Sequence, residues 1–287
     1  MQIIDFHTHI MPPWVIEHRD ELSRSDACFG MLYSDPNARL ATAEDLIRGM
    51  DEAEVAASVV LNVAWNDHDL CHQTNDYLLE CGSRWPERII PFCMVQPTAG
   101  DVALRELERC ASAGARGIGE LRPDVQGYDL ADANLLSPLV NIAIARQMIL
   151  LAHVSEPVGH VYPGKGTVRP EQPYAFATAF PDATLVCAHW GGGLPFYALM
   201  PEVGKALANV YFDTAATQYL YRPEVFDVVS HIVGADHILF GSDFPLIRQR
   251  RALDEVQRVQ LPNDAEPAII GGNAARLLNL RGAMTDG

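Results

Sequence analysis

Two histidines separated by one residue stand at the end of the first apolar run of the chain. In His7-Thr8-His9 both imidazoles would point to the same side of an extended strand, because side chains alternate along a strand. Two neutral imidazoles on one side form a chelating pair for a borderline metal such as zinc. The same pair could equally be satisfied by hydrogen bonds in a core. Whether it binds a metal therefore depends on whether other ligand-type side chains lie near it.

Four further ionisable residues also end short apolar runs. Glu120, taken alone, could be a loop carboxylate paired with Arg122. His153 and His189 could be hydrogen-bonded core histidines, and Asp243 could be a turn residue before a proline. One shared site explains all of these positions together better than separate coincidences do. The predicted metal ligands are therefore His7, His9, Glu120, His153, His189 and Asp243.

A ligand set of this kind predicts water activation. It could hold one ion in an open site, or two ions bridged by Glu120. Such an ion lowers the pKa of bound water to roughly 7 and polarises a carbonyl or phosphoryl oxygen. Asp243 is then placed to take the proton from that water. Zinc is the first expectation for the metal and manganese the second.

The elements that position these residues alternate regularly along the chain. Short runs rich in Ile, Val, Leu and Phe are typical of strands buried on both faces, and longer amphipathic stretches between them predict helices. The predicted strands are Gln2–His7, Ala57–Val63, Ile89–Val95, Ala115–Leu121, Met148–Val154, Ala183–His189, Val210–Asp213 and His237–Asp243. The predicted helices include Leu70–Trp85, Asp101–Ala113, Leu135–Arg146, Gln172–Phe180, Pro195–Leu207, Pro223–Val233, Leu253–Val259 and one starting at Thr42.

Eight such repeats predict an α/β fold, a (β/α)8 TIM barrel that forms a single domain over residues 1–287. The C-terminal ends of its strands would form one ring, which brings the candidate ligands to one mouth. Met11–Leu40 and Glu156–Pro173 are long connections after strand ends, where loops tend to be functional. The tail Pro267–Leu280 predicts two short helical pieces, with Asn273 capping the second.

The charge and the cysteines narrow the class of protein. A net charge of −16 repels phosphate backbones and anionic lipid, so we expect neither a nucleic-acid nor a membrane partner. None of the six cysteines forms a CxxC pair, and the first residues do not read as a signal peptide. We therefore expect reduced cysteines and a cytoplasmic protein. Barrels of this size often dimerise, so a homodimer is one expected assembly, with Met11–Leu40 contributing.

These motifs resemble the amidohydrolase superfamily over nearly the whole chain. The resemblance is closest to the amidohydrolase-related branch that also contains aminocarboxymuconate-semialdehyde decarboxylase and other lyases acting on ring-cleavage acids. It implies a metal-dependent TIM-barrel enzyme. The motifs that support it are DFHTH at 5–9, GIGEL at 117–121, LAH at 151–153, AHWGG at 188–192, FGSDFP at 240–245 and GNAARLL at 272–278.

The resemblance implies two alternative assignments of roles. In single-metal members the equivalents of four residues meet the ion, and the equivalent of His189 acts on substrate or water, which makes His189 a predicted catalytic residue beside Asp243. Those four residues are His7, His9, His153 and Asp243. In two-metal members His153 and His189 would hold the second ion and Glu120 would bridge. The presence of Glu120 favours two ions, or one ion with a weakly held second.

Basic and aromatic residues after the strand ends are candidates for binding a carboxylate-bearing small molecule. The predicted substrate contacts are Arg122, His160, Trp65 and Arg248. The first predicted function is a hydrolase of a small carboxylic ester, lactone or amide. The alternative is a lyase that decarboxylates or hydrates an unsaturated di- or tricarboxylic acid. A metal-dependent deoxyribonuclease is a third candidate, and the net charge of −16 counts against it. A non-catalytic barrel that binds metal or metabolite is less favoured than an enzyme.

Overall fold

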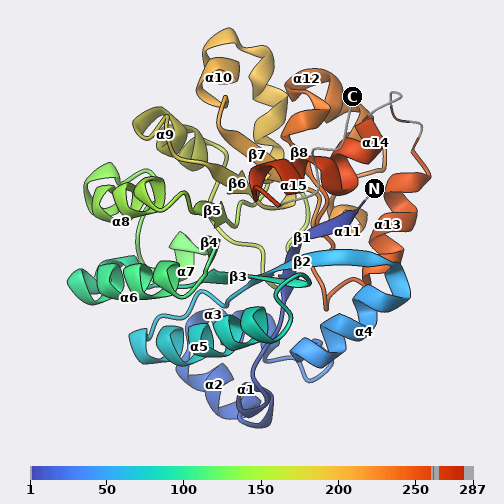
Figure 1. The fold of residues 1–287 in the computed structure, drawn as a ribbon. Helices are drawn as coiled ribbons and strands as arrows, with labels where there is room; N and C mark the ends of the chain where they lie inside the picture. Colours follow the sequence, from blue (N-terminus) through green and yellow to red (C-terminus); the bar gives the residue numbers. More distant parts are fainter. Residues whose placement is uncertain (1, 260, 262–264, 281–287) are drawn as a thin grey trace.

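The computed structural model describes residues 2–259, 261 and 265–280. Its eight strands are parallel and neighbour one another in chain order, with the helices arranged around them (Figure 1). The strands are β1 (Ile3–His9), β2 (Val55–Leu61), β3 (Ile89–Cys93), β4 (Gly117–Leu121), β5 (Ile149–Ala152), β6 (Leu185–Cys187), β7 (Val210–Asp213) and β8 (Ile238–Leu239). This confirms the predicted (β/α)8 TIM barrel.

The sheet closes where the chain after β8 returns to β1. The amide of His9 donates to the carbonyl of Phe244 at 2.7 Å, and the amide of Asp243 donates to the carbonyl of His7 at 2.9 Å. Further back, the amide of Phe6 donates to the carbonyl of Phe240 at 2.7 Å. Closure therefore holds three of the predicted ligands, from opposite ends of the sequence, on adjacent backbone segments.

The helices lie close to the predicted ranges. Thr42 begins α4 (Ala43–Ala53) with a capping box, in which its hydroxyl accepts from the amide of Asp45 and the Asp45 carboxylate accepts from the amide of Thr42. The other helices that follow the strands β2 to β8 are α5 (His68–Arg84), α6 (Asp101–Ser112), α7 (Pro123–Gln126), α8 (Ala133–Ala145), α9 (Glu171–Ala179), α10 (Pro201–Ala206), α11 (Thr217–Leu220), α12 (Val225–Val233) and α13 (Gln249–Gln257), with 3₁₀ turns η1 (Pro97–Ala99), η2 (His189–Leu199) and η3 (Ala235–His237).

Two predicted segments differ from the structure in detail. The predicted helix Pro195–Leu207 is two pieces, because η2 ends at Leu199 and α10 begins only at Pro201. The long connection Met11–Leu40 contains three short helices, α1 (Pro13–Glu17), α2 (Arg19–Ser25) and α3 (Ala27–Tyr33). No helix in the described part of the chain is both long and apolar enough to cross a bilayer.

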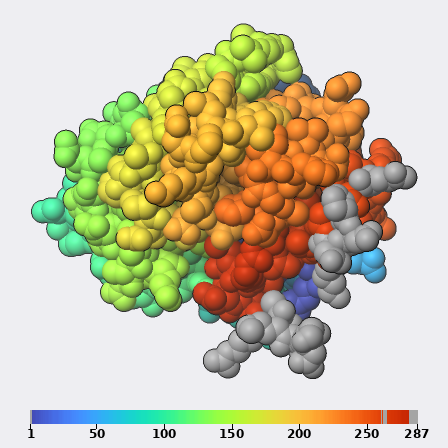
Figure 2. All heavy atoms as spheres, turned by 90° about the horizontal axis from the view of Figure 1, so that it is seen from above, coloured from blue at the N-terminus to red at the C-terminus, as the bar shows by residue number. Residues whose placement is uncertain are grey.

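The C-terminal segment packs against the barrel through α14 (Ala265–Pro267), the short π-helix η4 (Ala268–Gly272) and α15 (Asn273–Leu277). In Figure 2 this red segment lies beside the orange part of the chain. Ala274 and Leu278 join Ile4 and Phe6 in the core inside the barrel. The prediction that Asn273 caps a helix was wrong: its backbone is helical, and its Nδ2 donates to the carbonyls of Ala235 and Ile238, which fixes the segment to β8.

Candidate metal centre

The two histidines of β1 face each other at the C-terminal end of the strand, as predicted. His7 Nε2 lies 3.1 Å from His9 Nε2, and both side chains are buried. Two ring lone pairs this close would repel, so a proton or a metal ion must lie between them. His9 Nδ1 has no hydrogen-bond partner in the described part of the chain. This geometry and the donor atoms fit a chelating pair.

A carboxylate behind His7 fixes which of its nitrogens faces His9. His7 Nδ1 lies 2.8 Å from Asp213 Oδ2, and Asp213 Oδ1 accepts from the amides of His189 and Ala215 at 3.0 Å each. Because an ionised carboxylate only accepts, Nδ1 of His7 carries the hydrogen. Burial alone would lower the pKa of His7, but the charge and hydrogen bond of Asp213 raise it to about 10. A metal ion at this place would therefore compete with a proton for Nε2 of His7.

Asp243 and Glu120 complete the set from two other strand ends. Asp243 Oδ1 lies 3.7 Å from His7 Nε2 and 3.6 Å from His9 Nε2. Among the described residues, two groups have ligand atoms close enough to share an ion, namely His7 with His9 and Asp243, and His7 with Glu120 and His189. Both groups use His7, which offers Nε2 alone because Asp213 engages Nδ1. The geometry therefore fits one ion better than the bridged pair that Glu120 suggested.

The remaining histidine of the set contacts the centre through Glu120. His153 Nδ1 lies 2.9 Å from Glu120 Oε1, and its Nε2 lies 2.9 Å from the hydroxyl of Ser155. Both nitrogens are thus engaged, so direct coordination by His153 stays a prediction. Burial and then the charge of Arg122 lower the pKa of His153 to about 4, which keeps it neutral.

Glu120 also controls the protonation of His189. The two side chains approach to 3.4 Å between Glu120 Oε1 and His189 Nε2. Burial alone would lower the pKa of His189, but the hydrogen bond and charge of Glu120 and the charge of Asp243 raise it above its ordinary value. Burial raises the pKa of Glu120 in turn, yet the surrounding histidines hold it well below its usual range. Glu120 is therefore ionised, and its charge favours the protonated form of His189.

Tight turns direct His189 and Asp243 into the mouth. Both have left-handed backbone angles, with φ of 57° and 63°, which cost free energy for residues that have a Cβ. The turn after His189 continues in this conformation through Trp190 and Gly191. A Cβ on Gly191 would lie 2.9 Å from the ring of Phe212, so glycine is required there for space as well. Strained backbone at these two positions is typical of a functional site.

A cavity of about 390 Å³ opens over the centre. Arg122 lies at its wall with only 2% of its surface exposed, and its Nη2 donates to the carbonyl of Gly164 at 2.6 Å. Arg122 Nε has no partner among the described residues. A buried guanidinium with a spare donor is suited to an anionic ligand. The other polar lining residues of the cavity include His9, Glu120, His153, His160, His189 and Asp243.

The predicted substrate contacts divide into two groups. Arg122 and His160 line the cavity, His160 from the exposed connection after β5. The prediction for Trp65 was wrong, because its side chain is fully buried, stacks on Phe29 at 5.2 Å and donates to Asn62 Oδ1. The prediction for Arg248 was also wrong: Arg248 is exposed at the start of α13 and lines a neighbouring groove rather than the cavity over the metal centre.

Two kinds of site residue escaped the sequence analysis. Asp213 was recognised only as the end of a strand, although its place at the end of β7 follows the same rule as the other ligands. The apolar wall formed by Leu32, Tyr33 and Leu246 comes from connections whose path the sequence did not reveal. All six cysteines are free and buried in the structure.

A barrel of this topology with nitrogen and carboxylate donors at its mouth is the architecture of metal-dependent amidohydrolases. The model of the family described as "Amidohydrolase" matches residues 4–280. The chain therefore belongs to this family.

Its relatives include enzymes that decarboxylate aromatic acids. The chain is 23% identical to 6-methylsalicylic acid decarboxylase of Penicillium expansum, with 99% of this chain and 98% of that protein covered. The structure of 5-carboxyvanillate decarboxylase from Sphingomonas paucimobilis is similar with a TM-score of 0.79 and 16% identity, covering 97% of this chain and 99% of the other. A dihydroxybenzoic acid decarboxylase from a Polaromonas species, solved with manganese and 2-nitroresorcinol, has a TM-score of 0.76, 20% identity and 97% coverage of each chain.

Proposed function

We propose that this protein is a metal-dependent decarboxylase of a small hydroxylated aromatic carboxylic acid. This is the lyase alternative, with an aromatic acid in place of the unsaturated acid first expected. Its full-length relatives decarboxylate 6-methylsalicylic acid, carboxyvanillate or dihydroxybenzoic acid by name, which favours this reaction over ester, lactone or amide hydrolysis. The observation on which the proposal depends is Arg122, a buried cation with a spare donor in the same cavity as the imidazoles.

The cavity suits one substituted ring. Its volume of about 390 Å³ lies at the lower end of ordinary small-molecule sites. Leu32 and Leu246 supply apolar walls, while Arg122 supplies a fixed positive charge. The guanidinium would hold an anionic substituent and thereby orient the ring over the imidazoles. A ring that fills this cavity also excludes water from the reacting carbon.

The donor set fits a single divalent ion. His7, His9 and Asp243 would hold it, since their ligand atoms already lie within 4.8 Å of one another. When bound, such an ion supplies positive charge that polarises substrate oxygens and offsets negative charge developing on the ring. Asp213 keeps His7 in the tautomer that exposes Nε2. Zinc and manganese both accept this mixture of nitrogen and oxygen donors.

His189 would act as the general acid. In the reaction the bond between ring carbon and carboxylate breaks, carbon dioxide leaves, and the ring carbon receives a proton in its place. His189 holds that proton at Nε2, 3.4 Å from Glu120 Oε1, and donates it to the carbon. Glu120 keeps the imidazole protonated and oriented until the transfer. Solvent then returns a proton to His189, so the net change is one carboxylate and one proton converted to arene and carbon dioxide.

A product screen tests this function. Protein loaded with manganese or zinc would be incubated with hydroxybenzoates, and in parallel with lactones and amides. We expect equal amounts of carbon dioxide and arene from at least one hydroxybenzoate, loss of turnover with a chelator, and loss of turnover in His189→Asn despite retained metal. Acid release from a lactone or amide without carbon dioxide would instead support the hydrolase.

A further inference from the structure

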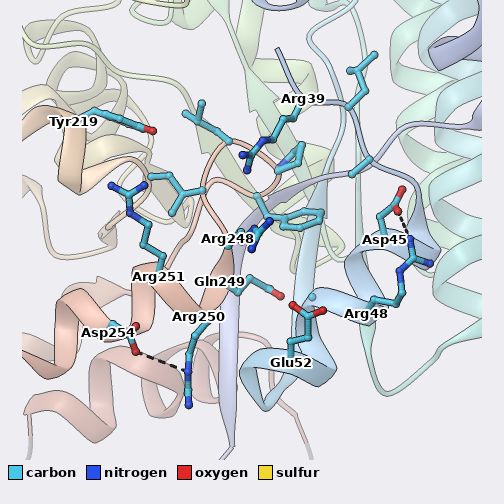
Figure 3. A pocket seen from close by; sticks show the side chains of 17 residues that line it. Arg39, Asp45, Arg48, Glu52, Tyr219, Arg248, Gln249, Arg250, Arg251 and Asp254 are labelled. Atoms are coloured by element: carbon cyan, nitrogen blue, oxygen red, sulfur yellow. Dashed lines mark hydrogen bonds and ion pairs between the residues drawn. The ribbon is translucent and has the colours of Figure 1, made fainter. Parts of the chain in front are cut away.

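A second, larger depression lies beside the catalytic cavity. It has a volume of about 1050 Å³ and lies between α4 and the segment 244–254, which includes the start of α13 (Figure 3). We call it the arginine groove, after Arg39, Arg48, Arg248, Arg250 and Arg251, which line it. Five arginines in one depression are unexpected in a chain with a net charge of −16.

Three of these five cations are available to a ligand. Arg48 pairs with Asp45, and Arg250 Nε lies 3.8 Å from Asp254 Oδ1. In the part of the chain that the structure describes, Arg39, Arg248 and Arg251 make no ion pair with a carboxylate. Against them the groove contains one further acid, Glu52, so its lining has a net positive charge.

The three free arginines line the groove from its Tyr219 side to its middle. In Figure 3 Arg39 and Arg251 lie on the side of the groove marked by Tyr219, Arg248 lies in the middle beside Gln249, and Asp45 lies toward the other side. They come from two separate segments, the connection before α4 and the first turn of α13. The first turn of a helix adds a positive dipole potential to that of the guanidinium groups.

Buried hydrogen bonds hold in place the backbone that carries Arg248, Arg250 and Arg251. Gln249, between Arg248 and Arg250, is buried, and its Nε2 donates to Asp5 Oδ2 at 2.8 Å and to the hydroxyl of Ser58 at 3.0 Å. The start of α13 is thereby fixed to β1 and β2. Fixed positions lower the entropy lost when a ligand binds.

We propose that the arginine groove is a second binding site, separate from the metal centre, for a small molecule with two or more carboxylate or phosphate groups. Three guanidinium groups in a groove of this volume match several anionic groups rather than one. Arg39, Tyr219, Pro245 and Leu246 line both the groove and the catalytic cavity, so a bound polyanion would lie at the entrance to the cavity. The site does not require the proposed decarboxylase reaction.

Calorimetric titration of the metal-loaded protein at low ionic strength tests this site. The probes are tricarballylate, for polycarboxylates, and fructose 1,6-bisphosphate, for bisphosphates. We expect at least one of them to bind, and the double variant Arg248→Gln/Arg251→Gln to raise its Kd by at least about tenfold, since charge-assisted contacts are lost. Added salt should weaken the same interaction.

Two matched variants make the result specific. Arg222→Gln/Arg258→Gln removes the same charge from exposed positions outside the groove and should leave Kd within about twofold, which controls for the general field of the protein. Arg122→Gln should also leave Kd unchanged, because Arg122 lines the catalytic cavity and is not among the described residues that line the arginine groove. The proposal is overturned if neither probe binds in the millimolar range, if the Arg248/Arg251 variant binds normally, or if Arg122→Gln abolishes binding.

Discussion

His7 Nδ1 lies 2.8 Å from Asp213 Oδ2, and both side chains are completely buried. The same carboxylate accepts the backbone amide of His189. Asp213 therefore orients one member of the chelating pair and anchors the turn that carries the proposed acid. Through this contact between β1 and β7, Asp213 fixes the orientation of His7, although the two residues lie 206 positions apart in the sequence.

Replacing this carboxylate should weaken metal binding without unfolding the barrel. In Asp213→Asn an amide faces His7, so the tautomer that exposes Nε2 is no longer favoured. We expect metal affinity to fall by about 10- to 100-fold, the usual effect of losing such a partner. Competition with a fluorescent chelator measures it. Asp182→Asn, at an exposed position, is the matched control, and equal affinities in the two variants would contradict the role of Asp213.

The metal content should be one ion per chain. Both candidate groups depend on Nε2 of His7, so they cannot be filled together by separate ions. Elemental analysis after reconstitution with manganese or zinc and desalting measures the ratio. Two tightly held ions per chain would contradict the single-ion site and favour the alternative in which Glu120 bridges two ions.

Arg122 should determine substrate affinity more than turnover. Arg122→Met removes the buried charge at nearly the same length, and we expect KM for a hydroxybenzoate to rise by about 30-fold or more, since a buried charged contact contributes about 2 kcal/mol or more. Arg122→Lys keeps the charge but loses the forked donors, so its KM should lie between that of the wild type and that of Arg122→Met. Steady-state kinetics measures both variants. An unchanged KM in Arg122→Met would remove Arg122 from the substrate site.

Acid should weaken the fold through Glu106, away from the metal centre. Burial raises its pKa, but hydrogen bonds from Arg109, Asn75 and His72 lower it from 4.5 to about 2. Because the pKa of Glu106 is lower in the folded protein, its ionised carboxylate stabilises the fold at pH values above the ordinary pKa of 4.5. This contribution is lost as the pH falls from about 4.5 toward 2.

Urea unfolding of metal-free protein tests this contribution. The stability difference between the wild type and Glu106→Gln should be on the order of 1–2 kcal/mol at pH 7, after allowance for screening, and should shrink as the pH approaches 3. The metal-free state is used so that loss of metal in acid does not contribute. A difference that stays constant over this pH range would contradict the lowered pKa.

The sequence was informative where backbone periodicity alone decides the geometry. Buried parallel strands are continuous apolar runs, and their C-terminal ends must share one rim, so His9, His189 and Asp243 could be placed together without coordinates. Thr42 could be recognised as a cap because its hydroxyl acts on a residue three positions away.

The errors lie where long-range packing decides. Trp65 follows β2, where a residue of the barrel mouth is expected, but its side chain stacks on Phe29 of α3 and is buried in the core. Arg248 follows β8, but the chain turns outward there, so its side chain enters the arginine groove. Asn273 lies at a helix start yet bonds to carbonyls near β8. Each partner is distant in sequence, and no local pattern indicates it.

Diffraction data collected at the manganese absorption edge, from crystals of the reconstituted protein, test the metal centre most directly. We expect one anomalous peak per chain, within bonding distance of Nε2 of His7, Nε2 of His9 and Oδ1 of Asp243. The absence of a peak there, or a single peak bound to other residues, would contradict the metal centre on which the proposed reaction depends.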